Sequence, residues 1–262
     1  MLEIKNASFG YKSKKETRTV VSSLNLTLEK GQLVCLLGAN GAGKTTVFRT
    51  VLKNLPLLSG DILVDGKSIS EYTREQLAAK IAYVPQQHTP PFPYTVLQVV
   101  EMGRCIHIGR FSSPSKEDEK LCLDILCELG INDLAEKNYT ELSGGERQLV
   151  LIARALAQES EYLLLDEPAS SLDYGNQALL LKKIRELCGK NIGICMIMHD
   201  PEQVLTLDCT AAVILSENSF RFGKASDIIN ADLIRELYGI PAEMHEWTDK
   251  NGAPVKSIRQ LF

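Results

Sequence analysis

The residues with the clearest chemistry lie between Gly38 and Thr45, where the pattern Gly-x4-Gly-Lys-Thr follows a short apolar run and precedes a helical pattern. The glycines permit a tight loop whose backbone N–H groups converge on phosphate oxygens, and the positive end of the following helix dipole adds to this attraction. Lys44 supplies a positive charge for the β and γ phosphates of a nucleotide, and Thr45 offers a hydroxyl to Mg²⁺. A glycine loop that merely turns the chain is the alternative. The predicted phosphate-binding residues are Gly38, Ala39, Asn40, Gly41, Ala42, Gly43, Lys44, Thr45 and Thr46.

Acidic and amide side chains follow other apolar runs. Asp166 and Glu167 come directly after the run 162–165, and Gln86 comes shortly after the run 81–84. Open α/β sheets gather their ligands at the carboxyl ends of strands. Asp166 suits outer-shell or water-mediated binding of Mg²⁺, Glu167 can polarise an attacking water, and Gln86 can reach both metal and water. The alternatives are that Asp166 and Glu167 only mark the start of a helix, and that Gln86 is an ordinary loop residue.

Two more side chains are candidates for contacts with a nucleotide. Tyr11 follows the first strand pattern, and its ring can lie against a base. His199 follows the apolar run 191–198 at the same predicted sheet edge as Glu167, where an imidazole can contact the γ-phosphate. The alternatives are that Tyr11 is an ordinary surface or core residue, and that His199 has only a structural role.

A second anion-binding helix start is predicted at Ser143, Gly144 and Gly145. Its backbone N–H groups, its serine hydroxyl and the positive end of the helix dipole would attract an anion in the same way as the glycine loop does. Further along, the turn 170–173 ends in Asp173, which can cap a helix over 174–188. The chain thus carries one phosphate loop and one separate helix start that favours an anion.

The patterns around these residues predict an α/β fold in one domain over 1–262. A nucleotide-binding core with an antiparallel β subdomain is expected over 1–87 and 160–223, with a polar insert 12–19 that enlarges the loop after Tyr11. Helical spacing predicts an inserted helical subdomain over 88–159, including a capped helix start at Ser115, and a helical extension over 224–262. The predicted helices span 47–54, 73–80, 96–102, 117–129, 149–158, 174–188, 225–229 and 231–237.

Composition excludes several classes of protein. The 262 residues carry a net charge of −4, which gives no electrostatic reason to expect a nucleic-acid partner. No apolar run approaches the ~20 residues that span a bilayer, so a soluble chain is expected. The seven cysteines form no Cys-x-x-Cys pair, which favours reduced and mostly packed thiols over a disulfide or metal framework.

Taken in order, these motifs resemble the complete set of an ATP-binding cassette (ABC) ATPase, a P-loop NTPase with a mixed sheet core. The resemblance rests on Tyr11, residues 38–45, Gln86, residues 142–148 and 163–168, residues 171–173 and His199. The stretches 77–86, 91–104, 237–241 and 251–254 are similar to the cassette subunits of iron-siderophore, haem and cobalamin importers. Met198 stands where a threonine is usual in the family.

The resemblance implies ATP and Mg²⁺ as cofactors and two cassettes packed head to tail. Nucleotide would lie between the phosphate loop of one copy and residues 143–145 of the other, with Asp173 beside it. The sequence supports this independently. One chain carries the phosphate loop of one nucleotide site and the helix start of another, so each chain holds only half of each site. Two copies related by a two-fold axis would complete both sites. A contact between the two segments within one chain is the alternative. The resemblance also implies membrane permease subunits, an external substrate-binding protein acting indirectly, and a peripheral location at the cytoplasmic face of the cell membrane.

Two other functions stay open from the sequence. One is a soluble ABC ATPase of DNA repair or translation, although the 57 positions from Gln86 to Ser143 leave no room for a long coiled coil. The other is a nucleotide-binding module without turnover, against which the presence of Glu167 and His199 argues. The transported substrate is not encoded here, because the permease and the binding protein select it.

Overall fold

A computed structural model of the chain describes residues 1–13, 16–86, 93–108, 113–170, 172–248, 252 and 254–261. The chain divides into two compact units: the first joins Met1–Glu71 to Ile194–Phe262, and the second is Tyr72–Gly193. Within the described ranges, no helix combines the length and the apolar character needed to cross a membrane.

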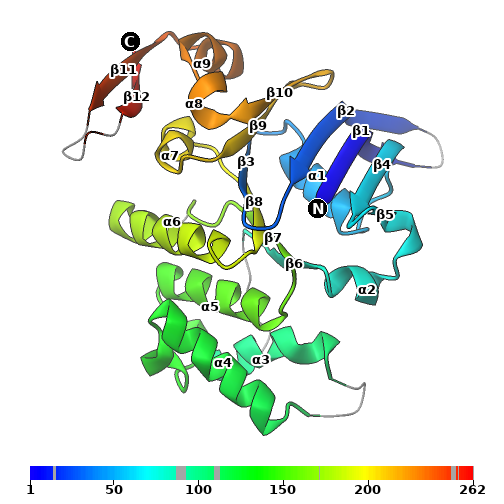
Figure 1. Cartoon of the computed structure of the whole chain (residues 1–262), viewed down its shortest axis with the longest axis vertical. Helices are drawn as coiled ribbons and strands as arrows, with labels where there is room; N and C mark the ends of the chain where they lie inside the picture. The colour runs from blue at the N-terminus through cyan, green and yellow to red at the C-terminus, as the bar shows by residue number, and fades with distance from the viewer. Residues whose placement is uncertain are drawn as a thin grey trace. The chain divides into compact units, whose positions relative to one another are not determined.

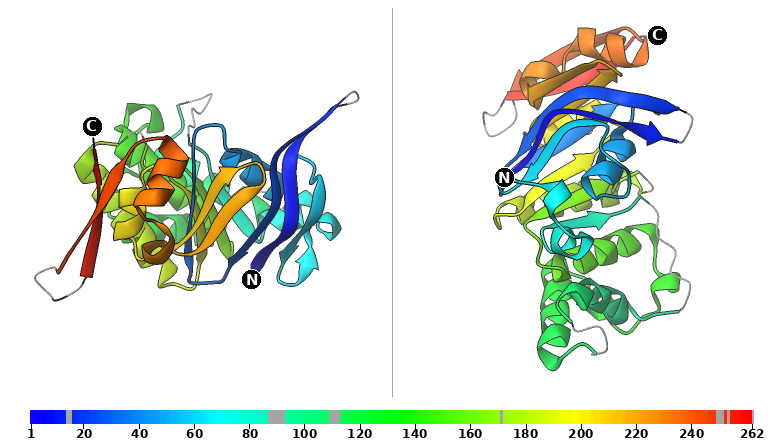
Figure 2. Two further views of the ribbon diagram at one scale, coloured as in Figure 1. Left: turned by 90° about the horizontal axis from the view of Figure 1, so that it is seen from above. Right: turned by 90° about the vertical axis from the view of Figure 1, so that its right-hand side faces the viewer.

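The first unit contains an antiparallel sheet with the strand order β2-β1-β4-β5 (Figures 1 and 2). Along β2, alternate side chains such as Leu24, Leu26 and Leu28 are buried, as the period of two in a half-buried strand requires. The strands of this sheet are β1 (Leu2–Lys12), β2 (Thr17–Leu28), β4 (Ser59–Val64) and β5 (Lys67–Ser68).

In the described part of the polar insert 12–19, the strands continue as far as Lys12 and resume at Thr17, so the enlarged loop does not begin directly after Tyr11 as the sequence predicts. Lys12 pairs with Thr17, so β1 and β2 continue into the insert as a hairpin. Its described side chains are exposed or half-buried, and polar residues can therefore occupy strand positions here. Residues 14 and 15 of the insert lie outside the described ranges.

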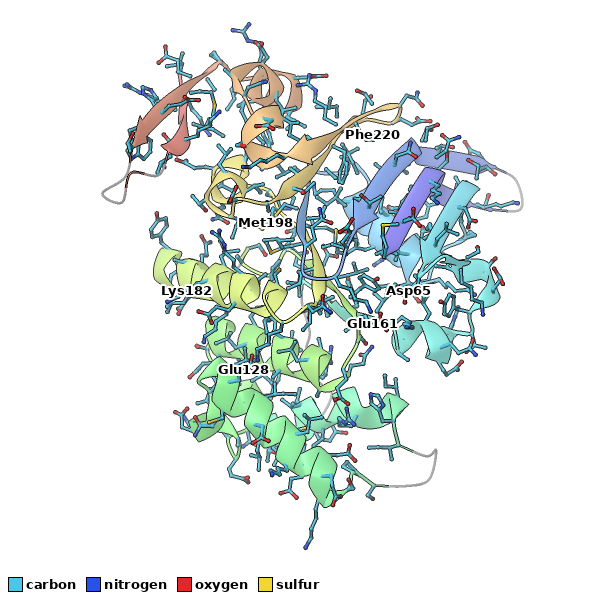
Figure 3. The ribbon with its side chains drawn as sticks, in the orientation of Figure 1. Asp65, Glu128, Glu161, Lys182, Met198 and Phe220 are labelled. Carbon is cyan, nitrogen blue, oxygen red and sulfur yellow. The ribbon has the colours of Figure 1, made fainter. Side chains whose placement is uncertain are left out.

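A second sheet of the first unit has the order β10-β9-β3-β8 and is mixed. Strand β3 runs parallel to β8 and to β9, whereas β9 and β10 form an antiparallel hairpin. Every residue of β3 and β8 is buried, which accounts for their unbroken apolar sequences. Met198, labelled in Figure 3, follows β8 and is also buried. The strands are β3 (Leu33–Gly38), β8 (Gly193–Ile197), β9 (Thr210–Ser216) and β10 (Ser219–Lys224).

The region 224–262, predicted as a helical extension, is helical only in its first part. After α9, Gly239 adopts a left-handed conformation with φ of 70° and ends the helix, and Pro241 comes two residues later. The remaining described residues form a two-stranded antiparallel hairpin, which corrects the prediction. The helices of the first unit and the strands of this hairpin are α1 (Lys44–Val51), α7 (Pro201–Thr206), α8 (Ala225–Ile228), α9 (Ala231–Tyr238), β11 (Ala242–Thr248) and β12 (Pro254–Gln260).

The second unit contains two parallel strands, β6 (Ile81–Val84) and β7 (Tyr162–Asp166). Its described residues also form five α-helices. The chain passes from one unit to the other after Glu71 and after Gly193. The predicted segment boundaries near residues 87 and 160 stay a prediction. Helices α3, α4 and α5 pack against one another (Figure 1). The helices are α2 (Arg74–Ala78), α3 (Val96–Glu101), α4 (Lys116–Leu129), α5 (Gly144–Ala157) and α6 (Tyr174–Cys188).

Capping boxes begin four of these helices, at Thr73, Thr95, Ser115 and Ser143. In each, the cap hydroxyl accepts from the backbone N–H three residues on, and that residue's side chain accepts in return. The predicted cap at Ser115 is confirmed.

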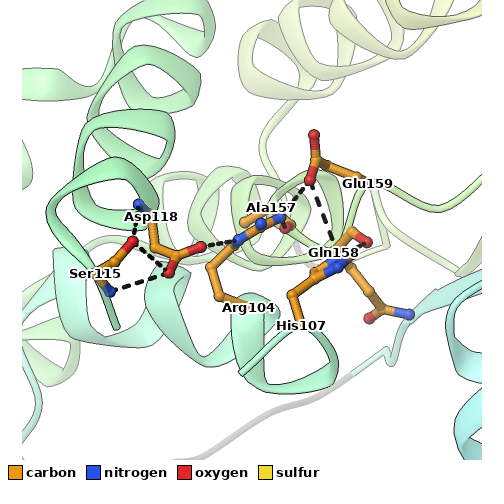
Figure 4. Close-up of polar contacts among 7 residues, drawn as sticks. All are labelled: Arg104, His107, Ser115, Asp118, Ala157, Gln158 and Glu159. Atoms are coloured by element: carbon orange, nitrogen blue, oxygen red, sulfur yellow. Dashed lines mark hydrogen bonds and ion pairs between the residues drawn. The ribbon is translucent and has the colours of Figure 1, made fainter. Parts of the chain in front are cut away.

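A buried arginine joins three of the helical segments of the second unit (Figure 4). Arg104 is 8% exposed and donates to Asp118 Oδ1 at 2.7 Å, to Glu159 Oε2 at 2.6 Å and to the Ala157 carbonyl at 2.7 Å. The backbone of Ser115 and then Arg104 hold the pKa of Asp118 at about 2. The end of α5 is thereby tied to the start of α4 and to the turn after α3.

Candidate active site

The phosphate loop, residues 38–45, connects the buried strand β3 to α1. A Cβ at Gly43 would meet Val20 Cγ1 at 2.7 Å and Val21 Cγ2 at 2.8 Å, and φ there is +95°, so only glycine fits without strain. A Cβ at Gly38 would meet the Ile214 carbonyl oxygen at 2.9 Å. Gly43 is the N-cap of α1 and has no side chain, so it makes no side-chain hydrogen bond to the helix start. The loop therefore presents the helix start to an external acceptor.

Lys44 is held inside this loop and is only 5% exposed. Its Nζ donates to the carbonyls of Gly38 at 2.7 Å and Ala39 at 3.0 Å. A positive charge is thus kept beside the uncapped start of α1, where it suits an anionic ligand.

Tyr11 lies beside the same loop. Its Oη is 3.2 Å from Oγ1 of Thr46, a buried residue of α1, while the tyrosine remains 47% exposed. The hydrogen bond fixes the ring next to the helix start, so the insert does not carry Tyr11 away from the loop. Thr45 is half-buried in the first turn of α1.

In the second unit, the parallel strands β6 and β7 bring Gln86, Asp166 and Glu167 together. Asp166 is 4% exposed and accepts from Tyr83 Oη at 3.1 Å. Gln86 Nε2 donates to Glu167 Oε2 at 2.6 Å. The sequence reasoning missed Tyr83, whose only signal was a hydroxyl in an otherwise apolar strand.

Glu167 has a left-handed backbone, with φ of +50°. Such a conformation costs a non-glycine residue on the order of 1 kcal/mol and is often found at functional sites. Ser170 holds the turn, because its backbone N–H and its hydroxyl donate to the Glu167 carbonyl at 3.2 and 3.0 Å. The carboxylate is therefore aimed by the turn as well as by the amide of Gln86.

His199 lies in the first unit, directly after Met198 and β8. It is half-buried, and its carbonyl accepts a hydrogen bond from Tyr238 Oη at 2.9 Å. The next residue, Asp200, caps α7 by accepting from Glu202 N–H at 2.9 Å. The sequence reasoning missed Tyr238, which is 39 positions away from His199.

The predicted second anion site is the start of α5 in the second unit. Ser143 and Gly144 are exposed. The Ser143 hydroxyl accepts from Glu146 N–H at 3.3 Å, and Ser143 N–H donates to Glu146 Oε2 at 2.7 Å. These hydrogen bonds lower the pKa of Glu146.

Asp173 is an exposed helix cap close to this segment. Its carboxylate accepts from the backbone N–H of Asn176 at 2.9 Å and from Asn176 Nδ2 at 2.7 Å, which lowers the pKa of Asp173. A Cβ at Gly145 would lie 3.4 Å from Asn176 Cγ. The structure thus brings Gly145 and Asp173 to the same asparagine, a residue that sequence reasoning did not single out.

Comparison with known proteins agrees with this arrangement. The ABC transporter family matches residues 21–170. The molybdate import ATP-binding protein MolC of Haemophilus influenzae is 33% identical over 92% of this chain and 88% of its own. The hemin import ATP-binding protein HmuV of Hahella chejuensis is 35% identical over 87% of this chain and 90% of its own. A solved structure described as a metal-chelate type ABC transporter, in an inward-facing conformation, covers 100% of this chain and 97% of its own with 32% identity and a TM-score of 0.87.

The family match covers more than half of the chain, and its range contains both the glycine loop with Lys44 and the strand-end acids. The chain therefore belongs to the ATP-binding proteins of ABC transporters, and it is the ATPase of such a transporter.

Proposed function

We propose that the chain hydrolyses Mg·ATP through Glu167 and thereby powers import of a metal chelate of the iron-siderophore, haem or cobalamin type. The observation that carries the catalytic part is the Glu167 carboxylate, held by Gln86 at 2.6 Å beside the buried Asp166. A carboxylate fixed at a strand end can orient or deprotonate water for attack on phosphorus.

Lys44 and the loop amides hold the β and γ phosphates in this proposal. Lys44 Nζ now donates to two carbonyls of its own loop, and phosphate oxygens would replace them as acceptors. Tyr11 lies against the base, and His199 braces the γ-phosphate. The start of α1, which Gly43 does not cap with a side chain, supplies further N–H donors.

The donors available for Mg²⁺ are oxygen atoms, which this ion prefers. They are the hydroxyl of Thr45, the carboxylate of Asp166 and the amide oxygen of Gln86, whose amide nitrogen is turned to Glu167. Bound Mg²⁺ neutralises charge on the phosphates. Thr45, Gln86 and Asp166 are the residues that would hold it.

Two copies are proposed to bind head to tail, so that Ser143, Gly144, Gly145 and Asp173 of one reach the nucleotide on the other. The cap geometry supports this, because residues 143, 144 and 173 are all exposed. Membrane permease subunits and, through them, an external binding protein would complete the transporter, which places this chain at the cytoplasmic face of the membrane. The likeness to a metal-chelate type transporter and to a hemin importer supports the substrate class.

The catalytic proposal is tested with Glu167→Gln and Lys44→Ala, measured as ATP hydrolysis and as ATP-induced stabilisation. ATP at about 100 times its dissociation constant should stabilise the wild-type protein by roughly 2.7 kcal/mol. Glu167→Gln should keep this stabilisation and lose turnover, whereas Lys44→Ala should lose both. Glu186→Gln, which alters a surface ion pair on α6, is the control and should behave like the wild type. Steady-state hydrolysis by Glu167→Gln would remove Glu167 from this role.

The substrate class is tested in proteoliposomes that contain the chain with its co-purifying permease. Haem, a ferric siderophore, cobalamin and molybdate should be compared as substrates that stimulate ATP hydrolysis. Stimulation by one of the first three supports the proposal. Stimulation by molybdate alone would align this chain with the MolC relative and contradict the metal-chelate assignment.

A further inference from the structure

The helix α9 reaches the turn that carries His199. Its last residue, Tyr238, donates a hydrogen bond from Oη to the His199 carbonyl at 2.9 Å. Because the peptide group is planar, a hydrogen bond to this carbonyl restrains the whole peptide unit that follows His199, and with it the backbone from which the imidazole projects.

The position of Tyr238 is well determined by its helix. Leu233, Ile234 and Leu237 of α9 are buried, and the side chain of Asn230 caps the start by accepting from Leu233 N–H at 2.9 Å. The left-handed Gly239 ends the helix directly after the tyrosine. Tyr238 therefore stands at a fixed point on an anchored helix.

The tyrosine also keeps its proton. Burial, and next the charge of Asp200, raise the pKa of Tyr238 above its ordinary value of 10. The hydroxyl is thus protonated and able to donate at neutral pH.

The other side of the same turn is supported by the C-terminal hairpin. Helix α7 begins at Pro201, immediately after the turn, and packs against β12. Strand β12 pairs with β11, which packs against α9. The turn at residues 199 and 200 therefore contacts α9 through Tyr238 and continues into α7, and both helices contact the same hairpin.

We infer that Tyr238 is a positioning residue for His199, and that α9 with the β11–β12 hairpin sets the reach of the imidazole. The inference rests on the proposed role of His199 at the γ-phosphate. Loss of the hydroxyl releases the carbonyl and lets the turn shift, which weakens a contact that matters for turnover more than for ATP binding.

The first test is Tyr238→Phe, which removes the hydroxyl and keeps the ring. We expect kcat for ATP hydrolysis to fall roughly 3- to 10-fold, the scale of one neutral hydrogen bond, with KM for ATP unchanged. Glu236→Gln, on the same helix as Tyr238, is the matched control, because it breaks the exposed ion pair between Glu236 and Arg221 of β10 and leaves the Tyr238 hydroxyl in place. An unchanged kcat in Tyr238→Phe would overturn the inference.

A double-mutant cycle separates positioning from general loss of structure. If Tyr238 acts through His199, then Tyr238→Phe should lower kcat in the wild-type background and should have no further effect on His199→Ala. The same fold-loss in both backgrounds would show a merely structural role and contradict the inference.

A readout without activity separates this inference from the proposed function. The chain has four histidines, so ring C–H signals in an NMR spectrum can be assigned with His199→Ala. Tyr238→Phe should shift the His199 signal and leave those of His107 and His245 in place. If the wild-type transporter does not hydrolyse ATP, the proposed function fails; if it does and the His199 signal does not move, only the inference fails.

Discussion

The two helix starts that are proposed to bind anions differ in how they are capped. Helix α1 begins from Gly43, which has no side chain to cap it, while Lys44 folds over the loop. Helix α5 begins from Ser143, whose hydroxyl and backbone N–H exchange hydrogen bonds with Glu146. The first start has no side-chain cap, whereas the second carries a complete capping box.

The difference bears on what each start can bind alone. An uncapped start with a neighbouring lysine attracts phosphate without help. The α5 start already satisfies part of its N–H groups and holds the negative charge of Glu146 nearby, with a lowered pKa. We therefore expect α1 to bind nucleotide in the single chain and α5 to contribute only when a second copy delivers the nucleotide to it.

The largest effect should come from Gly43→Ala. The new Cβ would meet Val20 and Val21 within 3 Å at φ of +95°, so the loop must move. We expect loss of measurable ATP binding and destabilisation of about 1–3 kcal/mol. Gly41→Ala is the control, because its φ is +79° but no atom lies within 4 Å of the added Cβ. Nucleotide fluorescence titration and thermal unfolding measure both, and equal binding by the two variants would contradict the packing argument.

The fold and the family were predictable because the residues of each motif determine the local structure around it. The glycine loop between β3 and α1, the helix at Tyr174–Cys188 and the cap at Ser115 are all determined by neighbouring residues, and as structural elements they are confirmed. The C-terminal hairpin was missed because Gly239 and Pro241 end a helix without determining the structure of the residues after them. The insert was misread because polar residues on exposed strand faces look like a loop.

The contacts that orient the site residues were not predictable. Tyr83 lies 83 positions before Asp166, and Tyr238 lies 39 positions after His199. Strand register and helix packing create these pairs, and neither leaves a local pattern in the sequence. The structure places the site side chains, whereas their roles toward ATP and Mg²⁺ stay predictions.

A smaller effect is expected from Ser143→Ala, with Ser115→Ala as its matched control. Both variants remove the hydroxyl of a capping box at the start of a helix of 14 residues, so each should cost about 1 kcal/mol of stability. Only Ser143→Ala should also reduce ATP hydrolysis, by at least about tenfold, because a hydrogen bond to a charged phosphate is lost. ATP binding to the single chain should persist in both. Equal hydrolysis by the two variants would assign Ser143 a purely structural role.

The smallest effect concerns pH and compares the acids of the same two capping boxes. The folded-state pKa of Asp118 falls from 3.8 to about 2 and that of Glu146 falls below 4.5, so the unfolded state binds protons first as pH drops. Each contribution to stability is complete above the ordinary pKa and is lost as pH falls through the folded value. Asp118→Asn should therefore flatten the fall in unfolding free energy between pH 3.8 and about 2 more than Glu146→Gln does, because Arg104 adds to the helix cap only at Asp118. Urea unfolding midpoints across this window measure the two slopes, and equal flattening would mean that the buried arginine adds nothing to the cap.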